Sequence, residues 1–168
     1  MVLTLPRPLL DRLCRAAEGA LPHECCGLLL GRPAPANNRA QAKSDDDPEI
    51  VVQDLWPATN DWEALADEPI RALDSIPAGE ASPERRYAIA PATMLAAMRA
   101  SRARNLDIIG VYHSHPQQSA VPSEFDRACA WPDYSYLILS VKGDRTVDWQ
   151  SWRLNPDRQF RPEAIVLL

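Results

Sequence analysis

The stretch from Ile108 to Asp126 constrains this 168-residue chain more than any other. It reads I-I-G-V-Y-H-S-H-P-Q-Q-S-A-V-P-S-E-F-D. Its apolar beginning predicts a buried strand over residues 108–112, and residues two apart on a strand face the same side. His113 and His115 are therefore expected to project from one face, while Ser114 points to the other. Two neighbouring imidazoles on a rigid element supply two ligands of a zinc site.

A third ligand is predicted a short distance further along the chain. Pro122-Ser123 begins a predicted short helix, Ser123 to Ala130, and Asp126 lies one turn into it. Hydrolytic zinc needs three protein ligands and one open position, which two histidines and an aspartate provide. Each part alone has a simpler interpretation. An H-x-H pair is often two surface histidines, and Ser-x-x-Asp is a helix N-terminal capping pattern.

The joint pattern resembles the signature of a known enzyme family. H-S-H-P, then six residues, Ser, two residues and Asp resembles the JAMM (MPN-plus, Mov34/PAD-1) zinc metalloproteases. Bacterial members of this family also have the pattern P-x-E-x-C-G-x-L-x-G on an early strand. Residues 22–31 of this chain, P-H-E-C-C-G-L-L-L-G, resemble that pattern. The resemblance extends over residues 22–154. It implies an α/β, cytidine-deaminase-like JAMM fold, in which helices sandwich a curved mixed β-sheet.

The resemblance also implies a reaction and a partner. It assigns Zn²⁺ to His113, His115 and Asp126, the general base to Glu24, and an oxyanion donor to Ser123. Related enzymes hydrolyse an amide or isopeptide bond after a C-terminal Gly-Gly. Compact bacterial members act on small β-grasp sulfur-carrier or ubiquitin-like proteins, and the segment 130–136 (A-W-P-D-Y-S-Y) resembles that group. The implied function is a zinc metallopeptidase or isopeptidase of such a carrier.

Three other functions are compatible with parts of the sequence. A non-catalytic MPN-type interaction scaffold would normally lack a ligand, whereas every ligand position is filled here. RadC-like proteins carry a similar H-x-H-P motif, typically with Asn where this chain has Ser114. A thiol hydrolase using Cys25 or Cys26 would need an activating group, and none is evident beside this apolar strand pattern.

Composition excludes several classes of partner. The net charge is −5 without a basic cluster, which argues against nucleic acid or an anionic membrane as the main partner. Four cysteines form no C-x-x-C pair, which favours free thiols in a reducing compartment. Neither a signal peptide nor an apolar run of the roughly 18 residues of a membrane span is visible. We therefore expect a cytoplasmic protein.

The pattern along the chain predicts one domain over residues 1–168, with an insertion at about 60–85. The insertion is expected to be either a lid or recognition element, or a surface loop. Helix 91–104 should bury Met94, Leu95 and Met98 and end at Asn105. The predicted helices are 8–18, 61–73 (interrupted by Pro69), 91–104 and 123–130. The predicted strands are 24–30, 49–55 (ended by Trp56-Pro57), 86–90, 108–112, 134–141 and 146–154, with a strand or short helix over 160–168.

Overall fold

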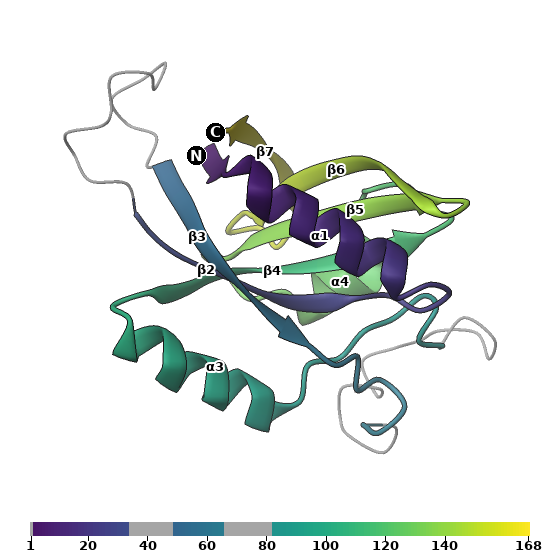
Figure 1. Ribbon diagram of the computed structural model, residues 1–168, viewed down its shortest axis with the longest axis horizontal. Helices are drawn as coiled ribbons and strands as arrows, with labels where there is room; N and C mark the ends of the chain where they lie inside the picture. Colours follow the sequence, from purple (N-terminus) through teal and green to yellow (C-terminus); the bar gives the residue numbers. More distant parts are fainter. Residues whose placement is uncertain (1, 34–48, 66–81) are drawn as a thin grey trace.

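The computed structural model describes residues 2–33, 49–65 and 82–168 (Figure 1). Helices occur between strands along the chain, as in a mixed α/β protein. In chain order they are β1 (Val2–Leu5), α1 (Arg7–Gly19), β2 (Cys26–Pro33), β3 (Glu49–Ala58), α3 (Pro91–Ala103), β4 (Asp107–Pro116), α4 (Glu124–Cys129), β5 (Ser135–Lys142), β6 (Arg145–Leu154) and β7 (Phe160–Leu167).

The strands form one mixed sheet that closes on itself. Their order is β1-β3-β2-β4-β5-β6-β7, and β7 pairs with β1. The pairs β1–β3, β1–β7 and β4–β5 are parallel, and the remaining pairs are antiparallel. The curved mixed sheet that the family resemblance implied is confirmed, with β4 between β2 and β5.

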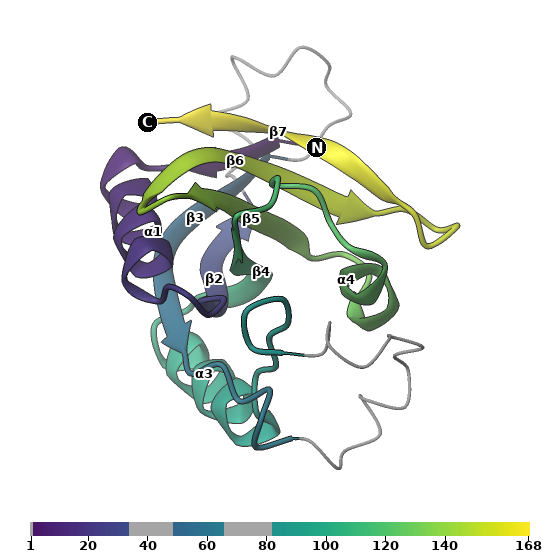
Figure 2. The ribbon, with the colours of Figure 1, turned by 90° about the vertical axis from the view of Figure 1, so that its right-hand side faces the viewer.

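Alternate residues of the central strands contribute to two separate apolar cores. Leu29 of β2 packs in the core that contains the buried stripe of α1, whereas Leu28 packs in the core that contains Ala97 of α3. This division follows from the two-residue repeat of a strand. Consequently α1 and α3 lie on different sides of the strands, as both views show (Figures 1 and 2). Helices therefore cover both faces of the sheet.

Several predicted elements are found where the sequence placed them. Helix α1 buries Leu9, Leu10, Leu13 and Ala17 on one stripe. Asn105 follows α3 with a φ of 54°, the left-handed conformation that a helix-ending residue adopts. Residues 160–167, for which strand and helix were both open, form strand β7.

Other local predictions were wrong. Residues 86–90 form no strand, and Glu24 precedes β2 instead of standing within it. Strand β3 continues through Trp56 and Pro57 to Ala58. Pro57 pairs with Gly27 of β2, but the pairing of β3 with β1 involves only residues 49–51, so no strand on that side needs the N–H that proline lacks.

Helix α3 also buries a different face from the one predicted. Leu95 and Met98 are 48% and 38% exposed, whereas Ala97 and Ser101 are buried and Met94 is partly buried. The helix therefore contacts the sheet through small side chains.

The predicted insertion is described only at its ends. Residues 60–65 and 82–85 lie within the described ranges, and residues 66–81, which include most of the predicted helix 61–73, lie outside them. Hydrogen bonds of the Asn60 side chain to the Pro83 and Arg86 carbonyls join the two described ends to each other.

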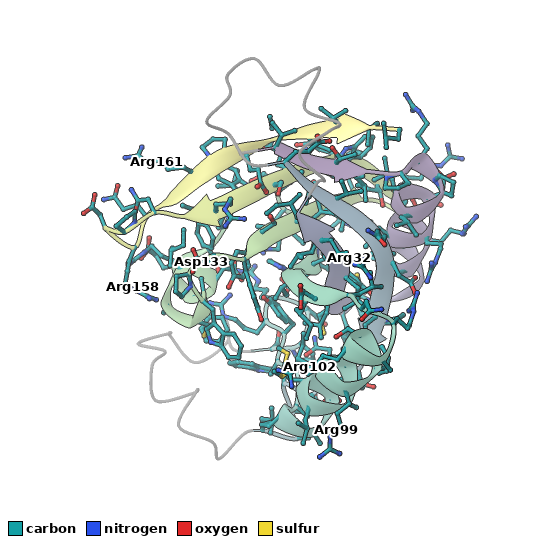
Figure 3. All side chains as sticks on the ribbon, turned by 90° about the vertical axis from the view of Figure 1, so that its left-hand side faces the viewer. Arg32, Arg99, Arg102, Asp133, Arg158 and Arg161 are labelled. Atoms are coloured by element: carbon teal, nitrogen blue, oxygen red, sulfur yellow. The ribbon has the colours of Figure 1, made fainter. Side chains whose placement is uncertain are left out.

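Basic side chains are distributed over separate parts of the surface. Figure 3 shows Arg99 and Arg102 on α3 and Arg158 and Arg161 at the β6–β7 end of the molecule. In the described ranges, no helix has both the length and the apolar character needed to cross a membrane.

Candidate metal and proton-transfer site

Strand β4 positions the two histidines in the middle of the sheet. It pairs with β2 on one side and β5 on the other, so that His113 lies opposite Cys26 and Ile138. The intervening Ser114 points the other way, and its Oγ accepts a hydrogen bond of 2.9 Å from the Cys25 N–H. The alternation expected from H-S-H is therefore present, on an element fixed along both edges.

The structure brings His113, His115 and Asp126 together. One ligand atom from each lies within 4.8 Å of the other two, and all three residues are buried. The two Nε2 atoms are 3.0 Å apart. Asp126 Oδ1 lies 3.4 Å from His113 Nε2, and Oδ2 lies 3.7 Å from His115 Nε2. Among the described residues, these three form the group whose ligand atoms lie close enough together to bind one metal ion.

A helix cap holds the carboxylate of Asp126 in place. Ser123 is the N-cap of α4, and its Oγ accepts from the Asp126 N–H at 3.1 Å. In return, the Ser123 N–H and hydroxyl donate to Asp126 Oδ2 at 2.6 and 2.7 Å. Asp126 thus belongs to both the capping pattern and the metal-ligand pattern, and the cap leaves its Oδ1 near His113 Nε2.

The two histidines are oriented by different contacts. His115 Nδ1–H donates to the Ser119 carbonyl at 2.8 Å, which leaves the lone pair on Nε2. His113 Nδ1 is buried without a hydrogen-bond partner among the described residues. Its ring instead stacks on Tyr87, with centroids 4.5 Å apart and planes 26° apart. Packing against an aromatic ring therefore takes the place of the usual hydrogen bond to a ligating histidine.

Glu24 completes the group of buried ionisable residues. Its side chain is 4% exposed, and its Oε1 lies 4.0 Å from His115 Nε2. Burial raises the pKa of the Glu24 carboxyl to about 8; the charge of His115 opposes this rise and that of Asp126 adds to it. Glu24 thus sits beside the three candidate ligands without being one of them.

Charges within the cluster also shift the pKa values of Asp126 and the two histidines. Although burial opposes it, the two histidines hold the pKa of Asp126 well below its usual range. Burial lowers the pKa of His113, while Asp126 and Glu24 outweigh burial and raise that of His115. An ionised Asp126 between two imidazoles at neutral pH creates a site that attracts a cation.

The residues fit a zinc ion. The Nε2 atoms of the two histidines lie 3.0 Å apart, and such a close approach is favourable only with a proton or a cation between them. Two histidines and one carboxylate are the donors of many hydrolytic zinc sites, with one position left open. When bound there, Zn²⁺ would supply a Lewis acid and lower the pKa of water toward about 7.

Sequence reasoning missed three residues that shape this site. Tyr87 lies in the segment predicted as a strand, Ser119 lies in a polar loop, and Asn60 lies at the start of the predicted insertion. Ser119 acts through its backbone carbonyl, which leaves no signal in a single sequence. Tyr87 and Asn60 lie far from the motif along the chain, so only the fold brings them to it.

Zinc uptake is expected to release the proton of Glu24. At pH 7, below its pKa of about 8, the metal-free carboxyl is mostly protonated, and a neighbouring dication favours the ionised form. Apparent zinc affinity should therefore rise with pH from 7 to 8. Calorimetry in buffers of different ionisation enthalpy should show about one proton fewer released per zinc in Glu24→Gln than in the wild type. Glu163→Gln, at a buried glutamate of β7, serves as the control; equal release from Glu24→Gln and the wild type would contradict this expectation.

Comparison with known proteins identifies the family. Residues 6–155 match the model of the prokaryotic homologs of the JAB domain. A protein of Haloferax volcanii named desampylase is 39% identical over 71 residues, 41% of this chain and 51% of that protein, so the chain spans about half the length of this curated relative. The solution structure of a Desulfitobacterium hafniense protein is 28% identical and has a TM-score of 0.70, covering 99% of this chain and 92% of the other. That of a Salinibacter ruber protein is 29% identical with a TM-score of 0.62, covering 98% and 90%. The chain therefore belongs to the prokaryotic homologs of the JAB domain, the family that its H-S-H-P motif indicated.

Proposed function

We propose that this protein is a zinc-dependent peptidase or isopeptidase that hydrolyses the amide bond after the C-terminal Gly-Gly of a small ubiquitin-like or sulfur-carrier protein. The observation that carries the proposal is a buried glutamic acid 4.0 Å from a cluster of two histidines and an aspartate. Family membership and the relative named desampylase support a hydrolase of this type. The choice of a carrier protein with a C-terminal Gly-Gly as substrate follows from the resemblance to the JAMM family.

His113, His115 and Asp126 would hold the zinc ion. The hydrogen bond from His115 to the Ser119 carbonyl and the Ser123 cap on Asp126 orient two of these ligands before metal arrives. Preorganisation of this kind reduces the cost of ordering side chains on binding.

Glu24 would move the proton. A carboxyl whose pKa lies near neutral can accept a proton from water and return it to the leaving amine, and such general acid–base catalysis contributes typically 10²–10⁴-fold. Its burial also keeps competing solvent away from the carboxyl.

Ser123 has a second task in this proposal, donation to the developing oxyanion. Its hydroxyl donates to Asp126 in the present structure, so the hydroxyl must rotate away from that carboxylate to reach a substrate oxygen. The backbone N–H of Ser123 also donates to Asp126 Oδ2 and would keep the carboxylate in place during this rotation.

Metal analysis combined with mass spectrometry tests the function. Protein purified without added metal should contain close to one zinc per chain and should remove a short peptide from a β-grasp carrier extended beyond Gly-Gly. A chelator should abolish cleavage, and zinc should restore it. The matched substrate with Ala-Ala in place of Gly-Gly should resist cleavage, because side chains widen the tail. Iron or manganese in place of zinc, or an uncleaved Gly-Gly carrier, would contradict the proposal.

A further inference from the structure

The side chain of Asn60 connects three segments that meet beside the candidate site. Its Nδ2 donates to the Glu24 carbonyl at 3.1 Å and to the Arg86 carbonyl at 2.9 Å, with the Pro83 carbonyl at 3.4 Å. Its Oδ1 accepts from the N–H groups of Trp62 and Ala88 at 3.1 and 3.3 Å. Both ends of the amide are thus in use.

These contacts replace strand pairing in the segments that they join. Glu24 precedes β2, and its N–H donates to the Pro83 carbonyl at 2.8 Å instead of to a neighbouring strand. Residues 82–90 belong to no strand, and the Asn60 amide bonds to the backbone on both sides of Tyr87. One side chain therefore fixes both the backbone of Glu24 and the segment whose tyrosine stacks on His113.

We propose that Asn60 is a positioning residue for proton transfer, acting by holding the backbone of Glu24 so that the carboxyl faces the cluster. This inference rests on the proposed function. Within the described ranges, no hydrogen bond joins the Asn60 side chain to the three candidate ligands, which have supports of their own in β4, Ser119 and the α4 cap. Losing Asn60 should consequently affect turnover much more than zinc binding.

Two variants separate this role from a general effect on folding. Asn60→Ala removes every hydrogen bond of the amide. Asn60→Asp keeps both acceptor bonds but removes the donors and sets a carboxylate against the Glu24 and Arg86 carbonyls. We expect both to retain zinc and to lower kcat roughly 10–100-fold with little change in KM, the range for residues that orient a site from outside it. Asn155→Asp is the matched control, because among the described hydrogen bonds the Asn155 side chain only accepts, from the Gln159 N–H at 2.8 Å in the β6–β7 connection.

A double-mutant cycle makes the test decisive. Because Asn60 acts through Glu24, adding Asn60→Ala to Glu24→Gln should lower kcat no further. Full additivity of the two losses, or loss of zinc in proportion to kcat, would overturn the proposal and leave Asn60 a purely structural residue.

A second measurement does not depend on hydrolysis. If the wild type cleaves no substrate, the proposed function fails, and amide hydrogen exchange still tests the link to Glu24. Exchange at the amides of Glu24, Trp62 and Ala88 should then be faster in Asn60→Ala than in the wild type. Unchanged exchange at Glu24 would overturn the inference.

Discussion

Replacing Glu24 with glutamine should leave zinc in place and reduce turnover by about 10²–10⁴-fold. The three candidate metal ligands do not include Glu24, so the metal site keeps its donors. Glutamine has the shape of the protonated carboxyl but cannot take up a proton from water. Zinc content and cleavage of a Gly-Gly carrier, measured on the same sample, check this result.

The fold should tolerate the change. With a pKa of about 8, the metal-free carboxyl is mostly neutral at pH 7, so glutamine replaces one neutral buried group by another. Glu163→Gln is the control for altering a buried glutamate, because Glu163 lies on β7, with β5 and β6 between it and β4. Loss of zinc together with activity would make Glu24 a ligand, and unchanged cleavage would remove it from the mechanism.

Replacing His113 with alanine should lower zinc affinity by roughly 10²–10³-fold. Apparent binding free energies of about 10–16 kcal/mol for four-ligand zinc sites correspond to roughly 2.5–4 kcal/mol for each ligand. His113 is fully buried and its Nε2 faces both other ligands, so neither water nor a neighbouring side chain can replace it without rearrangement. Competition against a chromophoric chelator measures the change.

His23→Ala is the matched control for this measurement. His23 is the remaining histidine of the chain, and it is exposed. Its replacement should leave zinc affinity unchanged. A His113→Ala variant that binds zinc as tightly as the wild type would refute the assignment of the ligand set.

The motif residues could be predicted because their spacing follows local rules. His113 and His115 share a face by strand alternation, and Asp126 sits at the third helical position after its cap. These rules operate within a few residues, so a single sequence contains them. Their convergence is then a consequence of two adjacent elements, β4 and α4.

The errors arose where distant residues decide the outcome. Residues 86–90 look like a strand, yet the Asn60 side chain bonds to the backbone of Arg86 and Ala88, and none of the described strands pairs with this segment. Strand β1 has only four residues, too few for a periodic signal, and its partners β3 and β7 lie far along the chain. Leu95 and Met98 are exposed because the sheet surface facing α3 accommodates the smaller Ala97 and Ser101.

The pairing of β2 with β4 has a consequence for biosynthesis. It joins Cys25 to Ser114 across 89 positions of sequence, and it brings Glu24 to the histidines. Domains form as units while the chain emerges from the ribosome. Glu24 leaves the ribosome before His113, His115 and Asp126, so a nascent chain contains the candidate proton-transfer group long before it contains the complete set of candidate ligands. This order withholds the complete set of candidate ligands, and with it the proposed hydrolytic activity, until most of the domain has been made.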